Sequence, residues 1–101
     1  MREAVRAALR EYPEVSEEGG GWETGWGPER ISGEHGLFLG HGYRVRVRHA
    51  VRLEGSAVVV RSVVERRPPG GPRANRWERV DPRPAEEGFL DAVARELEGT
   101  P

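Results

Sequence analysis

Between residues 43 and 53, apolar and charged side chains alternate almost without interruption. Successive side chains on a β-strand point to opposite faces of the sheet. One face of this predicted strand carries Tyr43, Val45, Val47, His49, Val51 and Leu53, and the other carries Arg44, Arg46, Arg48, Ala50 and Arg52. A strand with one apolar and one charged face is typical of an antiparallel sheet that packs on a core with only one side.

A second strand is predicted at residues 56–66, after a tight turn at residues 54–55. A turn of two residues at that place sets Arg48 opposite Arg61. Like charges directly opposite each other destabilise a sheet unless an anion or an acidic side chain lies between them. We therefore interpret this pair as a hint of a partner. The second strand is also apolar on both faces around residues 58–60 and 63–64, which favours burial on both sides.

Two helices are predicted, one near each end of the chain. The first covers residues 1–12 and ends before Pro13, which cannot continue the backbone hydrogen-bond ladder. Its apolar face carries Val5, Ala8, Leu9 and Tyr12. The second begins near Pro82 and Pro84, because proline suits the first helical turn, and it ends near Gly99. Its apolar stripe, which we expect to lie in the core, carries Phe89, Leu90, Val93 and Leu97.

The remaining segments complete a small α+β domain. Residues 75–80 predict a third, shorter strand, and residues 36–40 are a candidate for a fourth. Residues 14–42 are rich in glycine, and we expect partial strand or turn structure there, with Trp22 and Trp26 packing it down. The sequence thus predicts one domain over residues 1–101, with an antiparallel sheet of three or four strands and both helices on its apolar face.

The distribution of charge changes the meaning of the overall composition. The formal net charge of the 101 residues is −1, yet residues 43–83 hold eleven Arg against four acidic residues, between two acidic flanks. All sixteen basic residues are Arg, which is typical of GC-rich coding DNA, and the scarcity of Asn, Gln, Met and Cys is one feature of heat-adapted proteins. The chain can therefore have a strongly basic sheet face although its net charge is close to zero.

Motifs for catalysis or cofactor binding do not emerge from the sequence. Without Cys there is no disulfide framework or thiolate metal site, and His35, His41 and His49 lack metal-ligand spacing. There is no GxSxG motif, and no Lys to complete a phosphate-binding loop. We therefore expect a non-catalytic protein with no cofactor and no metal. We also expect no membrane span and, because charged residues interrupt the first twelve positions, a cytoplasmic location.

Two functional hypotheses use the same arginine-lined sheet face. The first is protein–protein association, with formation of a homodimer or a small assembly, because apolar side chains among the arginines mark an interface. The second is RNA or DNA binding, because arginine pairs with phosphate and tryptophan can stack on bases. The residues predicted to bind an anionic partner or to form the interface are Arg44, Arg46, Arg48, Arg52, Arg61, Val59 and Val63. The predicted stacking or lid residues are Trp22, Trp26 and Trp77.

Overall fold

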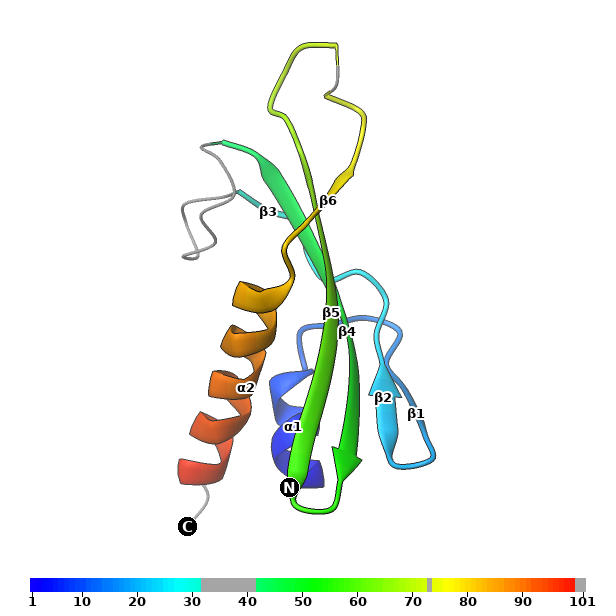
Figure 1. The fold of residues 1–101 in the computed structure, drawn as a ribbon, viewed down its shortest axis with the longest axis vertical. Helices are drawn as coiled ribbons and strands as arrows, with labels where there is room; N and C mark the ends of the chain where they lie inside the picture. The colour runs from blue at the N-terminus through cyan, green and yellow to red at the C-terminus, as the bar shows by residue number, and fades with distance from the viewer. Residues whose placement is uncertain (32–41, 73, 100–101) are drawn as a thin grey trace.

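The computed structural model describes residues 1–31, 42–72 and 74–99, and it shows an antiparallel sheet with two helices (Figure 1). The predicted α+β class is confirmed, but within these described residues the sheet has six strands rather than three or four. The helices are α1 (Arg2–Ala8) and α2 (Arg83–Glu98). The strands are β1 (Ser16–Glu18), β2 (Gly21–Glu23), β3 (Arg30–Ile31), β4 (Arg44–Glu54), β5 (Ala57–Arg67) and β6 (Glu78–Val80). The predicted strand at residues 36–40 lies outside the described residues.

The long hairpin of β4 and β5 is the centre of the sheet, and its register differs from the predicted one. Glu54 pairs with Ala57, so the turn lies at Gly55 and the residue after it, and Gly55 adopts a positive φ of 61°. Arg48 therefore lies opposite Val63 and not opposite Arg61. The predicted like-charge pair does not exist, so this position does not indicate a partner. Because the register differs by two residues, the division of side chains between the two faces is unchanged.

Residues 21–31 run along one edge of β4 and supply the strands that were not predicted individually. β2 pairs with the end of β4 and β3 with its beginning. Between them, the N–H of Thr24 donates to the carbonyl of His49 at 3.0 Å, and the N–H of Gly27 donates to that of Val47 at 2.8 Å. β1 continues the sheet beyond β2. On the other side of the hairpin, β6 pairs with residues 64–66 of β5 and is shorter than the predicted strand at 75–80.

Both helices pack on the sheet face that carries His49, as the alternation predicts. The core consists of Ala4, Val5, Leu9, Trp22, Val51, Phe89 and Val93. The helix α1 ends at Ala8, earlier than predicted, and turns lead from it to Pro13. No helix in the described part of the chain is long and apolar enough to cross a membrane.

The apolar stripe of α2 is divided between the core and the surface. Phe89 and Val93 are 5% and 3% exposed, as expected of core residues. Leu90 and Leu97 are 39% and 42% exposed, so the expectation that they lie in the core is wrong. Their exposure follows from the width of the sheet, because β5 is its last strand at this level of α2.

Candidate functional site

Arg46 lies between two tryptophan rings on the sheet face that points away from the helices. Its guanidinium carbon is 4.1 Å from the ring centroid of Trp26 and 4.2 Å from that of Trp77. The same guanidinium donates to Glu65 Oε1 from Nε at 3.0 Å and from Nη2 at 2.6 Å. A planar guanidinium can stack on aromatic rings and grip a carboxylate at the same time. The expected open row of arginines is therefore interrupted at Arg46, whose side chain is 25% exposed.

Two further arginines contact the same rings. Arg48 lies over Trp26 at 4.8 Å, and Arg67 lies over Trp77 at 5.0 Å. Contacts of this kind contribute about 0.5–2 kcal/mol each, more when they are shielded from water. We call the group the Arg–Trp cluster: Arg46, Arg48, Arg67, Trp26 and Trp77. It ties the segment after β2 and the residue before β6 to the two long strands.

The other predicted site arginines differ in their surroundings. Arg44 lies opposite Arg67 in the register, and Glu29 Oε1 reaches both of them, at 3.9 Å and 3.3 Å. An acidic side chain thus does separate a like-charge pair, although at another position from the predicted one. Arg52 pairs with Glu54. Arg61 is exposed, and the described residues provide no ion-pair partner for it.

The apolar members of the predicted site divide between surface and core. Val59 and Val63 are half-buried on the arginine face, opposite Arg52 and Arg48. Trp22 is 2% exposed and pairs with Val51 on the helix-covered face. Trp22 is therefore a core residue, whereas Trp26 and Trp77 cover arginine side chains.

The outer edge of β5 is open over much of its length. In the described part of the chain, β6 pairs only with residues 64–66, so residues 57–63 have a strand neighbour on the β4 side alone. The N–H of Ser62 points to this outer edge, where it donates to Glu86 Oε2 of α2 at 2.9 Å. Because backbone groups alternate between the two edges of a strand, the N–H and C=O groups of Val58 and Val60 face the same open edge.

The two outer edges of the sheet differ in chemistry. β1, at the far edge, exposes Glu17 and Glu18, and charges of this kind normally protect a sheet edge from pairing with another chain. The open part of β5, residues 57–63, holds five apolar residues and a single charge, Arg61. An unprotected apolar edge is a template for a further strand.

Glu86 also identifies the side of α2 that faces this edge. Leu90 and Leu97 follow Glu86 by four and eleven residues, which are close to whole numbers of helical turns, so the three side chains share one side. Val58 and Val60 are half-buried on the helix-covered face of β5. Val58, Val60, Leu90 and Leu97 therefore form an apolar strip beside unpaired backbone groups, which we call the β5–α2 strip.

On the helix-covered face, His49 is the centre of a buried hydrogen-bond chain. Its Nδ1 lies 2.6 Å from Ser62 Oγ, and its Nε2 lies 2.9 Å from Tyr12 Oη. The ring packs against Tyr12 and Phe89, with centroid distances of 4.8 Å and 4.7 Å. Burial lowers the pKa of His49 to about 4, so the imidazole is neutral at pH 7. Burial, and then the charge of Glu11, raise the pKa of Tyr12 to about 12.

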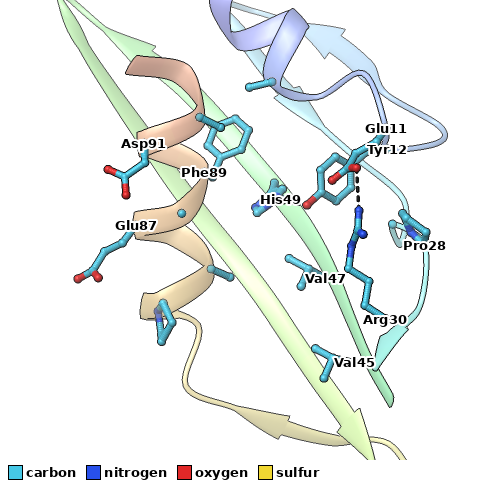
Figure 2. A pocket seen from close by; sticks show the side chains of 16 residues that line it. Glu11, Tyr12, Pro28, Arg30, Val45, Val47, His49, Glu87, Phe89 and Asp91 are labelled. Carbon is cyan, nitrogen blue, oxygen red and sulfur yellow. Dashed lines mark hydrogen bonds and ion pairs between the residues drawn. The ribbon is translucent and has the colours of Figure 1, made fainter. Parts of the chain in front are cut away.

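A cavity of about 550 Å³ lies between α2 and the segment that contains Pro28 and Arg30 (Figure 2). Val45, Val47 and His49 form its floor, while Glu87 and Asp91 point away from it. Both ring nitrogens of His49 already have partners, and Ser62 is 7% exposed. The Ser62–His49 pair therefore serves the packing of the core, and its geometry does not present a nucleophile to the cavity.

A metal site is not apparent where the structure can be described. Across residues 1–31, 42–72 and 74–99, no three His, Asp or Glu side chains gather as ligands. His35 and His41 lie outside these ranges.

Sequence reasoning missed the β5–α2 strip and the His49 hydrogen-bond chain. The signal for the strip was present, because the valines of β5 are apolar on both faces and α2 has more apolar residues than one core side requires. The signal for the chain was hidden by the register. Once the turn is placed at residues 55–56 instead of 54–55, His49 falls directly opposite Ser62.

No protein-family model, curated protein or solved structure matches the chain.

Proposed function

We propose that this chain is a non-catalytic association domain that receives an extended strand of a protein partner along the open edge of β5. The observation that carries the proposal is the β5–α2 strip, where unpaired backbone groups of Val58 and Val60 lie beside the exposed Leu90 and Leu97. Strand addition is a recurring mode of protein recognition, in which main-chain hydrogen bonds give affinity and flanking side chains give specificity.

The strip suits an added strand energetically. A new strand would satisfy the backbone groups of Val58 and Val60, and its side chains on the helix-covered face would contact the leucines of α2. Completing the burial of two half-exposed leucines contributes about 1 kcal/mol each. The protected edge at β1 offers no comparable surface, because Glu17 and Glu18 are exposed there.

A protein partner is favoured over a nucleic acid because carboxylates of the chain itself already pair with several of the arginines. Arg44, Arg46, Arg52 and Arg67 have carboxylate partners within the chain, and phosphates would have to compete with them. RNA or DNA binding by the arginine face stays a prediction, which the experiment below separates from strand addition. Binding through phosphates must weaken steeply as salt is added.

The test is binding of a fluorescently labelled peptide with the sequence of residues 56–62, followed by fluorescence anisotropy and by amide hydrogen exchange. We expect saturable binding that slows exchange at Val58 and Val60. The amides of Val59 and Arg61 point towards β4, so their exchange rates should change less. The double variant Leu90→Glu/Leu97→Glu should weaken binding at least tenfold.

The matched control is Val15→Glu, because Val15 is 42% exposed and lies next to β1, away from the β5 edge. This variant should bind the peptide like the unaltered chain. In a chain that light scattering shows to be monomeric, absence of peptide binding and of new amide protection at millimolar peptide would overturn the proposal. A dimeric chain is first diluted to its monomeric state, because a second copy would occupy the same edge. Tight, salt-sensitive binding of labelled oligonucleotides in the same experiment would instead support the nucleic-acid hypothesis.

A further inference from the structure

Resting on the proposed function, we infer that the strand received by β5 is the β5 strand of a second copy of this chain. The two copies lie antiparallel about a two-fold axis that passes midway between Val59 and its equivalent. Three features of the described residues lead to this arrangement: the free backbone groups of β5, the spacing of the leucines on α2, and the position of Arg61.

The free backbone groups select the register. Val58 and Val60 are the residues whose N–H and C=O groups face outward without a partner, while the outward N–H of Ser62 is occupied by Glu86. A two-fold axis at Val59 sets each Val58 opposite Val60 of the second copy, and each pair exchanges both of its hydrogen bonds. A shift of the axis to Val60 would set Val58 opposite Ser62, whose N–H is already bound. Symmetric pairing at Val59 therefore uses all the outward N–H and C=O groups of Val58 and Val60.

The leucines of α2 place the same axis independently. Figure 1 shows α2 running antiparallel to β5, and the contact between Glu86 and Ser62 aligns the two elements. Val59 is three residues from Ser62, or about 10 Å along a strand. The same length along α2 is about seven residues, which leads from Glu86 to Val93. The midpoint between Leu90 and Leu97 falls next to Val93, so the axis sets each Leu90 beside Leu97 of the second copy.

The charges agree with this pairing. With the axis at Val59, Arg61 lies opposite Ala57 of the second copy, so the two Arg61 side chains do not face each other. Val59 meets its own equivalent on the arginine face. Such self-complementarity is what a two-fold interface requires, because one surface must fit itself.

The test uses single cysteines, which report cleanly because the chain has none of its own. In the inferred register, Val59 and its equivalent form a pair without mutual hydrogen bonds, with a Cα separation of about 4.5 Å. This separation is within disulfide range. Val59→Cys should therefore give a disulfide-linked dimer on mild oxidation. Light scattering of the unaltered chain should give twice the monomer mass, and Leu90→Glu/Leu97→Glu should halve it.

The matched control is Ala57→Cys, on the same strand and the same face. Its equivalent would lie about 13 Å away along the paired strands, beyond the reach of a disulfide, so it should stay unlinked. A dimer by light scattering in which Val59→Cys does not link, or in which Ala57→Cys links instead, overturns this arrangement but not the association function. A chain that stays monomeric but binds the peptide overturns the second copy alone. Failure of both measurements overturns both proposals.

Discussion

Glu86 Oε2 of α2 accepts a hydrogen bond of 2.9 Å from the backbone N–H of Ser62 on the outer edge of β5. In the described chain, this contact closes the edge at the point where pairing with β6 stops. It also fixes α2 along β5, so that Leu90 and Leu97 come to lie beside the part of the edge that remains open.

Glu86→Ala should lower the free energy of unfolding by about 1–2 kcal/mol, because the partly buried N–H of Ser62 loses its acceptor. Urea unfolding measures the loss, and hydrogen exchange at Ser62 should accelerate in parallel. Glu86→Gln retains an oxygen acceptor and should lose less than half as much. Equal losses in the two variants would show that the hydrogen bond to Ser62 is not the cause.

Arg46→Glu should destabilise the fold by more than about 2 kcal/mol, because it places a carboxylate beside Glu65 and removes the cation between Trp26 and Trp77. Chemical unfolding followed by tryptophan fluorescence measures the change. Arg61→Glu is the control. It reverses an exposed charge on the same face and should alter stability by no more than about 0.5 kcal/mol. Similar effects at both positions would mean that Arg46 is as free as Arg61.

Stability should fall as the pH is lowered from about 6.5 towards 4. The pKa of His49 is lowered by burial from 6.5 to about 4, so in this window the unfolded chain binds a proton that the folded chain rejects. Above pH 6.5 His49 is neutral in both states, and the free energy of unfolding has its full value. Between pH 6.5 and 4 the free energy of unfolding falls by about 3 kcal/mol. Unfolding free energies measured at several pH values check this.

The His49→Phe variant isolates this effect from the titration of the other histidines. It should remove most of the pH dependence between 6.5 and 5, where few carboxylates titrate. An unchanged slope in the variant would assign the pH dependence to other groups.

Gly27→Ala should destabilise the protein by about 1–3 kcal/mol, because the added Cβ would lie 2.7 Å from the ring of Tyr12. The Tyr12 ring would have to shift, which disturbs the hydrogen bond that its hydroxyl shares with His49. Thermal and urea unfolding measure the loss. Gly88→Ala has the opposite expectation: the added methyl group meets no atom within 4 Å, and alanine favours a helix by about 1 kcal/mol. A loss of stability at Gly88 would contradict this description of α2.

The faces of the central hairpin were predictable from the sequence, but its register was not. Alternation with period two fixes which side chains share a face, and a slip of two residues leaves that pattern unchanged. Only the turn distinguishes the two registers, and Gly55 is compatible with either position of the turn. The ion pair between Arg46 and Glu65 and the contact between His49 and Ser62 both depend on this choice.

The exposure of Leu90 and Leu97 could not be predicted from the sequence, for a different reason. Helical periodicity places them at the border of the apolar stripe, but whether they are covered depends on how far the sheet extends beneath α2. The pairing of β6 with only three residues of β5 decides this, and that length is a tertiary property. The role of Trp26 was likewise open, because packing over an arginine or stacking on a ligand requires the same residue type.

The Arg–Trp cluster gives the sheet an outer layer built without a helix or a strand. At the level of Arg46 the sheet has the cavity beside α2 on one side and indole rings on the other. The enclosed group on the second side is a charge, held flat between aromatic planes. A lysine at this position would keep the positive charge but would not hold the two indole rings, because an ammonium group has no flat face for stacking. The flat guanidinium of Arg46 thus allows two indole rings to cover the helix-free face of the sheet.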